Sequence, residues 1–308
     1  MTILNTELHH RILEKKKKLD AIRPLPSSTV RKIQQQLQIE YIYNSNAIEG
    51  NTLTLRETQL VIEEGMTVGG KPLREILEVR NHPQAIEYIE TLTKKEKLGE
   101  HDIFTIHQII MKDIIDDAGR YRSGDVRITG TDYIPPPAHD VPFLMESMLD
   151  RYNRNSDELL PLELTAWLHH DFVHTHPFSD GNGRVARLLM NVALLRSGYP
   201  MTVIRRVDRK SYYEALHRAD KGNLSSFVNF VASAVEQTLD LYLRVIGPAN
   251  DSLIPISEAV KGSRYSQEYI SLLVRKRKIP GIKSGRNWKV SKDMIQRYTE
   301  QLDKKGQE

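Results

Sequence analysis

The residues best suited to chemistry lie in one stretch, His176 to Arg187. Pro177 disfavours helical backbone at the residue before it, so we expect a helix to end near His176 and its imidazole to stand in a loop. An imidazole has an ordinary pKa that suits proton transfer near neutral pH. Asp180 supplies a carboxylate, a ligand that Mg²⁺ commonly takes together with phosphate oxygens.

The glycines that follow predict an anion site. The segment Gly181–Gly183 lets backbone N–H groups approach an anion closely, and the next helix begins there with its positive dipole end. Arg184 and Arg187 lie on the same side of that helix's first turns. A base, a Mg²⁺ carboxylate, an anion-binding loop and two arginines indicate phosphoryl or nucleotidyl transfer. The loop is not a P-loop, because no Lys-Ser/Thr pair follows the glycines.

The residues HPFSDGNGR resemble the signature of the Fic family, HPFx(D/E)GN(G/K)R, at every fixed position, and the second arginine is also present. A weaker similarity runs from about Tyr41 to Leu241 and includes the segment AGRYRSGDVRITG and the Tyr212-Tyr213 region. The resemblance implies an all-α fold, the Fic helical fold, with a small β-hairpin flap.

The resemblance also implies a reaction, the adenylylation of a protein. His176 would accept the proton of a target Ser, Thr or Tyr hydroxyl, which attacks the α-phosphate of ATP. Asp180 would hold Mg²⁺ between the α- and β-phosphates, and Arg184 and Arg187 would grip the β- and γ-phosphates. The nucleotide contacts implied in this way are Asp180, Gly181, Asn182, Gly183, Arg184, Val185, Ala186 and Arg187, the flap residues Val126, Arg127, Ile128 and Thr129, and Tyr212, Tyr213 and Asp220. The flap would dock a target segment by strand addition.

A second motif, Ser45 to Gly50, bears on regulation. Ser45 and Glu49 stand one helical turn apart, and Gly50 is a natural helix stop. A carboxylate at a helix C-terminus is disfavoured by a few tenths to ~1 kcal/mol, so Glu49 needs a cation. The segment resembles the family's inhibitory pattern (S/T)xxxE(G/N) of the N-terminally inhibited class. The resemblance implies that Glu49 pairs with Arg187, in cis or within a homodimer, and blocks the γ-phosphate.

Helices must hold these motifs. Apolar residues from Leu164 to Phe172 recur every four positions, and a second apolar stripe runs from Val185 to Leu195. Between about Val126 and Pro142, alternation followed by three prolines predicts a short hairpin or flap. We expect a helical N-terminal region, 1–100, that carries the inhibitory helix, and a Fic catalytic core at 101–246.

Residues 251–308 read as a separate domain behind a linker, Gly247 to Asn250. Two short helices are predicted to start at Ser257 and Ser266. A two-stranded wing would turn at Ser284-Gly285, and a last helix would start near Lys292. This pattern is typical of a winged helix-turn-helix.

The charge of this segment suggests a partner. It has thirteen Lys/Arg against seven Asp/Glu, whereas the whole chain has a net charge of only +4. Any DNA contact therefore belongs here. The expected contacts are Lys276, Arg277, Lys278, Lys283 and Arg286. Docking of protein targets or support of a homodimer is the alternative.

Three other readings stay open. His170 and His174 have the spacing of a metal-binding pair, although helix-surface and packing roles for them and for His169 are favoured. His170-Asp171 also resembles the His-Asp pair of metal phosphohydrolases, but no other residue of the sequence completes that ligand set. The enzyme could instead remove AMP from a modified protein, with Glu49 positioning water. The chain could also be a DNA-binding regulator whose Fic domain senses nucleotide.

The composition of the chain bears on its cellular compartment. It has no cysteine, which removes thiolate chemistry and fits a reducing cytoplasm. No stretch approaches ~20 uninterrupted apolar residues, so the sequence predicts neither membrane spanning nor export.

Overall fold

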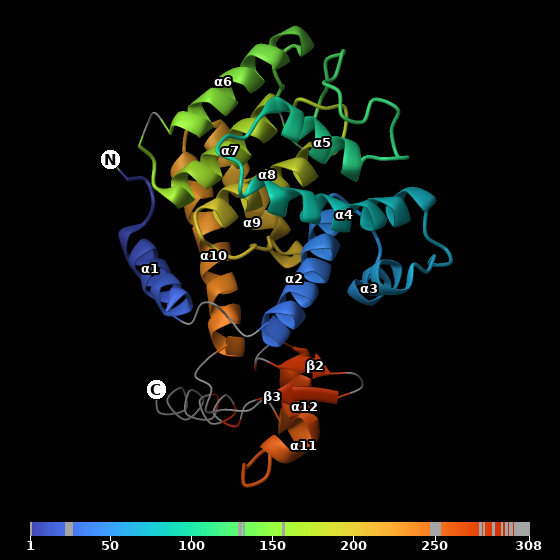
Figure 1. Cartoon of the computed structure of the whole chain (residues 1–308), viewed down its shortest axis with the longest axis vertical. Coiled ribbons are helices and arrows are strands. Elements are labelled where there is room, and N and C mark those ends of the chain that lie inside the picture. Colours follow the sequence, from blue (N-terminus) through green and yellow to red (C-terminus); the bar gives the residue numbers. More distant parts are fainter. Residues whose placement is uncertain are drawn as a thin grey trace. The chain divides into compact units, whose positions relative to one another are not determined.

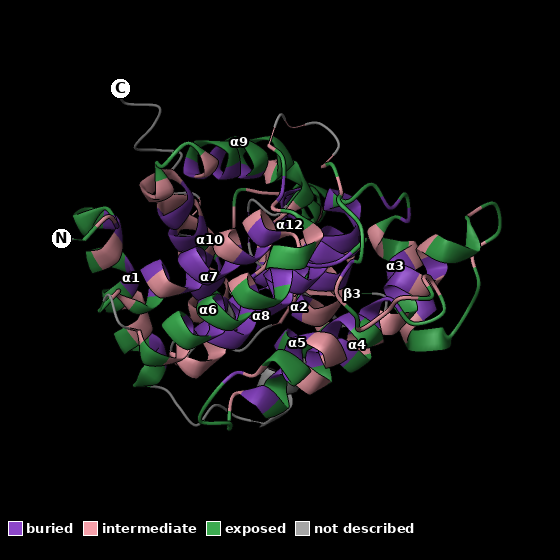
Figure 2. Ribbon diagram, turned by 90° about the horizontal axis from the view of Figure 1, so that it is seen from above, coloured by how far each residue is buried: buried purple, intermediate pink, exposed green. Residues whose placement is uncertain are grey.

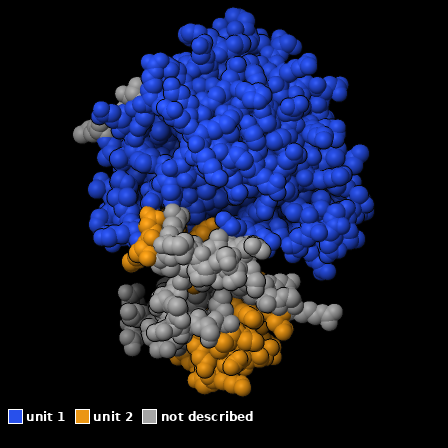
Figure 3. All heavy atoms as spheres, in the orientation of Figure 1, with its two compact units in different colours: residues 1–17, 34–238 blue, residues 18–33, 239–308 orange. Residues whose placement is uncertain are grey.

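The computed structural model describes residues 2–21, 27–128, 131, 133–155, 158–246, 254–276, 279, 281–284, 287–290, 292, 295 and 298. Two compact units form, one of residues 1–17 and 34–238 and the other of residues 18–33 and 239–308 (Figure 3). The linker expected at 247–250 lies outside the described residues, and the division at 1–100, 101–246 and 251–308 stays a prediction.

Helices dominate the described chain, as the sequence predicts (Figure 1). They are α1 (Thr6–Asp20), α2 (Ser27–Ile48), α3 (Leu55–Glu64), α4 (Leu73–Leu92), α5 (Glu100–Ile110), α6 (Val141–Arg154), α7 (Pro161–Thr175), α8 (Asn182–Arg196), α9 (Arg209–Asp220) and α10 (Leu224–Ile246), with 3₁₀ turns η1 (Ala138–Asp140) and η2 (Arg206–Asp208). No described helix has the length and apolar character needed to cross a lipid bilayer.

Helix α8 forms the centre of the larger unit, and α4, α5 and α7 pack against it. Every residue from Arg184 to Leu194 is buried, so the helix is enclosed on all sides rather than along the single stripe that its sequence suggests (Figure 2). Two of these buried residues are the arginines Arg184 and Arg187. Because a buried charge needs partners, the neighbouring helices must supply them.

Local backbone signals end the helices that carry the motifs. Helix α7 stops at Thr175, since His176 takes the left-handed conformation with φ 49°. Helix α2 stops at Ile48, and Gly50 follows with φ 105°, a value that glycine adopts without strain. Both predicted stops are therefore confirmed.

The segment expected to form a flap follows Arg122. Its described residues 126–128, 131 and 133–137 belong to no helix or strand, in keeping with the missing N–H donors of Pro135 to Pro137. Thr129 lies outside the described residues. Among the residues that the structure describes, the antiparallel hairpin lies instead at residues 282–290.

That hairpin belongs to the smaller unit. Strands β1 (Ile254–Pro255), β2 (Ile282–Ser284) and β3 (Asn287–Val290) form an antiparallel sheet in the order β1-β3-β2, beside α11 (Ile256–Ala259) and α12 (Gln267–Arg275). The Ser266 side chain caps α12 by accepting the N–H of Tyr269.

The small core of this unit also agrees with the sequence. Ile270, Leu273 and Val274 of α12 are buried together with Val290 of β3. The two helices and the hairpin are thus confirmed, whereas β1 is an addition. The predicted cap at Ser257 is wrong, because α11 begins at Ile256 with Pro255 as its N-cap. Gly285, Arg277, Lys278 and Arg286 lie outside the described residues, and the assignment as a winged helix-turn-helix stays a prediction.

Candidate active site

His176 stands in the loop after α7, as predicted. Its Nδ1 lies 3.2 Å from the carbonyl oxygen of Val173. A carbonyl oxygen only accepts hydrogen bonds, so this contact puts the proton on Nδ1 and leaves Nε2 free to accept one. Burial lowers the pKa of His176, and the charge of Arg122 adds to this effect, although the Val173 contact opposes it. The imidazole is therefore neutral at pH 7.

The motif loop is held from inside by Asn182 and His107. The Asn182 side chain donates to the Phe178 carbonyl oxygen at 2.8 Å and accepts the Phe178 N–H at 2.9 Å. The His107 ring of α5 stacks on Phe178 with centroids 3.7 Å apart. Its Nδ1 accepts the Gly119 N–H, so its Nε2 carries the proton that is donated to the Asp180 carbonyl oxygen at 3.0 Å. Burial lowers the pKa of His107 to about 4.

Two glycines make room where α8 begins. Gly181 has φ 78°, and a Cβ on it would come within 2.9 Å of the Met111 sulfur. A Cβ on Gly183 would collide with Oε1 of Glu49. The first N–H groups of a helix have no helical partner, so this end of α8 suits an anion. The side chains of Val185 and Ala186, also predicted as contacts, are buried in the core.

The Asp180 carboxylate lies between arginines from two helices. It forms an ion pair with Arg74 of α4 and a second with Arg184, whose Nη2 is 3.3 Å away. Burial would raise the pKa of Asp180, but Arg184, the Gly181 N–H and Arg74 together lower it. The group is therefore ionised at pH 7. A single carboxylate beside an anion-binding loop fits Mg²⁺, which usually takes one or two carboxylates plus phosphate oxygens and water.

Arg184 faces α4 as well as the loop. Its side chain is 2% exposed, and its Nη1 lies 2.9 Å from Oε1 of Glu78. Glu78 also pairs with Arg74 at 3.3 Å. The motif arginine is therefore neutralised by Glu78 and Asp180 together.

Arg187 is neutralised by Glu49 at the end of α2. Its Nη2 lies 2.8 Å from Oε1 of Glu49. Ser45 lies one turn earlier. Arg187 donates from Nε to the Ser45 hydroxyl (3.0 Å) and from Nη2 to the Ser45 carbonyl oxygen (2.8 Å). Burial would lower the pKa of Arg187, but the charge of Glu49 raises it above its ordinary value. The structure therefore brings Ser45, Glu49 and Arg187 together.

Arg122 ties the flap segment to the catalytic loop. The buried guanidinium donates from Nε to the His176 carbonyl oxygen (2.8 Å), from Nη2 to the Pro136 carbonyl oxygen (2.5 Å) and from Nη1 to the Gly124 carbonyl oxygen (3.1 Å). Beyond it, Val126 and Ile128 are half-buried and Arg127 is exposed.

The three residues predicted on α9 fall into two places. Tyr212 is buried, and its hydroxyl lies 3.1 Å from Nε2 of His169. Tyr213 stands beside Tyr212 with ring centroids 5.1 Å apart, and burial and the charge of Glu49 raise the pKa of Tyr213. Asp220, at the other end of α9, instead contacts His170 and His174. Their role as nucleotide contacts stays a prediction.

Three residues that shape the site, Arg74, Glu78 and His107, have no signal in the sequence motifs. Arg122 lies within the segment AGRYRSGDVRITG, but nothing in the sequence indicates a role for it. Arg74 and Glu78 have the i,i+4 spacing of an ordinary helix-surface pair, so spacing alone does not distinguish them. A base with a fixed tautomer, an ionised carboxylate and an anion-binding helix end together suit nucleotidyl transfer.

Comparison with known proteins agrees with this chemistry. Residues 97–194 match the family model described as Fic/DOC family. The chain is 39% identical over 244 residues to a protein adenylyltransferase Fic of Nematostella vectensis, an alignment that covers 78% of this chain and 56% of that protein. The chain therefore spans about half the length of the curated relatives it matches.

Solved structures of Fic proteins are also similar to this chain, and the similarity covers nearly their whole length. A Fic domain-containing signalling protein of Bacteroides thetaiotaomicron has a TM-score of 0.72 at 31% identity, covering 77% of this chain and 96% of that one. A Fic family protein of Desulfovibrio desulfuricans has a TM-score of 0.68 at 25% identity, covering 94% of this chain and 96% of that one. With its motif, its site and its fold in agreement, the chain belongs to the Fic/DOC family.

Proposed function

We propose that this protein is a Mg²⁺- and ATP-dependent protein adenylyltransferase, which transfers AMP from ATP to a hydroxyl group of a target protein. The observation that carries the proposal is the state of His176: its Nδ1 is committed to the Val173 carbonyl oxygen, and its Nε2 is free to accept a proton. The base stands in the loop that leads into α8, four residues before an ionised Asp180.

The transfer is a displacement at the α-phosphorus. His176 accepts the proton of the target hydroxyl, the hydroxyl oxygen forms a bond to the α-phosphorus, and the bond to the bridging oxygen breaks so that pyrophosphate leaves. Asp180 would hold Mg²⁺, which neutralises phosphate charge when it is bound. The N–H groups of the Gly181–Gly183 segment would face the α-phosphate, and Arg184 and Arg187 the outer phosphates.

The remaining nucleotide contacts belong to the same proposal. The flap residues Val126 to Ile128 would dock the target segment, and Tyr212, Tyr213 and Asp220 would line the nucleotide pocket. Because Arg122 links the His176 and Pro136 carbonyl oxygens, a docked flap and the base would share one anchor.

Glu49 would restrain this reaction within the chain. The Glu49 carboxylate occupies Arg187 and crowds Gly183, the two groups that the γ-phosphate and the anion hole require. A nucleotide can seat its outer phosphates only when this ion pair opens. The resting enzyme would therefore be slow until Glu49 moves away from Arg187.

Mass spectrometry of proteins exposed to the enzyme tests the proposal. Wild type, Glu49→Gly and Glu49→Gly/His176→Ala are each incubated with Mg²⁺, ATP and cell lysate, and AMP adducts are counted on lysate proteins and on the enzyme. We expect adducts to rise with Glu49→Gly and to vanish with the double variant. Adducts from neither His176-containing protein, across several lysates, would contradict the function. Loss of pre-formed adducts with wild type would identify the reverse reaction.

A second candidate activity concerns the smaller unit. We infer that it contacts DNA, because its sequence carries a formal charge excess and the exposed Lys276 follows the end of α12. Anisotropy of labelled duplex DNA with the full chain should show binding that weakens steeply with salt and with Lys276→Glu. No binding at high micromolar protein would favour docking of a protein target instead.

A further inference from the structure

Three side chains meet where α7 and α9 end. The proposed reaction gives them no shared role. His170 Nε2 lies 3.0 Å from Oδ1 of Asp220, and His174 Nδ1 lies 3.3 Å from the same oxygen. One ligand atom from each of the three lies within 4.8 Å of the other two. The histidine pair is visible in the sequence, but Asp220, fifty residues from His170, completes the set only in the fold.

These separations suit a small transition-metal ion. Two ligands of a tetrahedral ion with bonds of about 2.0–2.1 Å stand about 3.3–3.4 Å apart, which is close to both N–O distances. Two imidazoles and one carboxylate, with water in the fourth position, are a ligand set that Zn²⁺ uses in proteins. Mg²⁺ and Ca²⁺ prefer sets made of oxygen atoms.

The charge of the cluster also favours a cation. Among the residues that the structure describes, Asp220 pairs with no lysine or arginine, only with the two histidines.

An ion could reach the three ligands from solvent. The side chains of His170, Asp220 and His174 are 13%, 19% and 37% exposed. Partial burial holds the ligands in place, and the more exposed edge at His174 leaves room for a water molecule as a further ligand.

We propose that His170, His174 and Asp220 bind a divalent transition-metal ion of the Zn²⁺ class through Nε2, Nδ1 and Oδ1 respectively. The ion fastens the last turns of α7 to the end of α9. The Tyr133 hydroxyl donates to the His174 carbonyl oxygen at 2.9 Å, and His176 follows two residues later. The bound ion therefore stabilises the turn that presents His176. It also stabilises the contact between this turn and Tyr133 of the flap segment.

Cobalt titration of the full chain tests the site without any use of activity. Co²⁺ serves as the probe, because its visible absorption reports four- or five-coordinate binding by nitrogen and oxygen ligands. The protein is first freed of metal by a chelator and then titrated near pH 7.5, about one unit above the ordinary imidazole pKa, because imidazole binds metal as the neutral form. We expect one equivalent of Co²⁺ to bind with an intense visible band that Zn²⁺ displaces.

Variants assign the site to its residues. His170→Gln and His174→Gln should each weaken Co²⁺ binding at least about tenfold. Loss of a residue that only hydrogen-bonds to a metal ligand already lowers metal affinity by about 10–100-fold, and these two residues are ligands themselves. Both variants keep Asp220, so any nucleotide contact of Asp220 is tested separately. His139→Gln is the matched control. His139 Nε2 lies 3.4 Å from Asp140, but both side chains are exposed and no second histidine joins the pair.

A stability measurement gives a second readout. Zn²⁺ should raise the unfolding temperature of wild type and His139→Gln but not of His174→Gln, because binding to the folded state alone stabilises it. The absence of stoichiometric Co²⁺ binding, or equal binding by wild type and both histidine variants, overturns the proposal.

Discussion

Glu49 and Arg187 form a 2.8 Å ion pair beside Gly183, at the point where α8 begins. Arg187 is 1% exposed, so its charge is compensated almost wholly from within the protein. The pair joins the end of α2 to the catalytic motif across 138 residues of sequence, and it occupies the arginine on which the outer phosphates of ATP would depend. In the proposed reaction, control would therefore reside in this one carboxylate.

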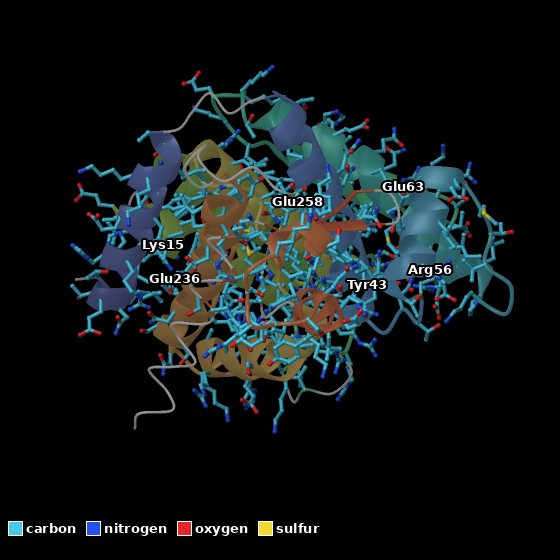
Figure 4. All side chains as sticks on the ribbon, turned by 90° about the horizontal axis from the view of Figure 1, so that it is seen from below. Lys15, Tyr43, Arg56, Glu63, Glu236 and Glu258 are labelled. Carbon is cyan, nitrogen blue, oxygen red and sulfur yellow. The ribbon has the colours of Figure 1, made fainter. Side chains whose placement is uncertain are left out.

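Removal of that carboxylate should strengthen nucleotide binding. Glu49→Gly frees Arg187, and hydrogen bonds to charged groups contribute about 1.5–3 kcal/mol each, so we expect Mg²⁺–ATP affinity to rise by about 10–100-fold. Isothermal titration measures the change. Glu63→Gln, at an exposed position of α3 (Figure 4), is the control and should bind as wild type does. Equal affinity for the Glu49 variant would contradict the proposed block.

Arg74 should compete with Mg²⁺ for Asp180. Its guanidinium pairs with that carboxylate, yet the side chain is 52% exposed, so the pair contributes only up to about 1 kcal/mol. Arg74→Gln should lower the Mg²⁺ concentration that supports ATP binding by no more than about fivefold. Arg56→Gln on α3 (Figure 4) is the control. A higher Mg²⁺ requirement in the Arg74 variant would show that Arg74 helps to bind the nucleotide instead.

Loss of Arg122 should slow transfer more than it weakens ATP binding. The guanidinium holds the His176 carbonyl oxygen and the flap segment, and a misplacement of ~1 Å can cost about 10²-fold in rate. We expect Arg122→Gln to lower kcat about tenfold or more, with Arg122→Lys intermediate and exposed Arg56→Gln unchanged. The measurement is steady-state transfer in a Glu49→Gly background. A change confined to the affinity for ATP would argue against this anchoring role.

His107 should make stability depend on pH. Burial lowers its pKa to about 4 in the folded chain, against 6.5 as the ordinary value. Between these pH values the unfolded chain binds the extra proton, so this group lowers stability as pH falls from 6.5 to 4, by up to about 1.4 kcal/mol per pH unit. Urea unfolding at several pH values measures the slope.

The His107→Gln variant isolates this contribution. It should be less stable than wild type at pH 7, because the contacts with Phe178 and Asp180 are lost, but its slope below pH 6.5 should be shallower. His101→Gln, an exposed histidine of the same helix, should leave the slope unchanged. Identical slopes for wild type and the His107 variant would refute the neutral, buried state of His107.

Local signals explain which parts of the site could be predicted from the sequence. Pro177 acts on its neighbour, so the loop position of His176 follows from two adjacent residues. Gly50 and Gly181 likewise set backbone conformations where they stand. The pairing of Glu49 with Arg187 came from resemblance to a family pattern, because no periodicity connects residues so far apart.

Tertiary contacts explain which parts could not be predicted. Arg122, His107 and Glu78 act through partners on other segments, and their spacing is that of ordinary loops and helices. The flap segment belongs to no strand in its described residues, since prolines there outweigh the alternation of Val126 and Ile128. Asp220 meets His170 only because α9 packs against α7.

The most direct test of the central claim follows the two ends of ATP separately. Glu49→Gly and Glu49→Gly/His176→Ala are given ATP labelled at the α- or the γ-phosphate, and ATP affinity and protein-bound label are measured together. We predict that only α-label reaches protein, that the double variant loses transfer by about 10²–10⁴-fold, and that both proteins bind ATP alike. Transfer of γ-label, or undiminished α-label transfer without His176, would contradict the proposal that His176 is the base of a protein adenylyltransferase.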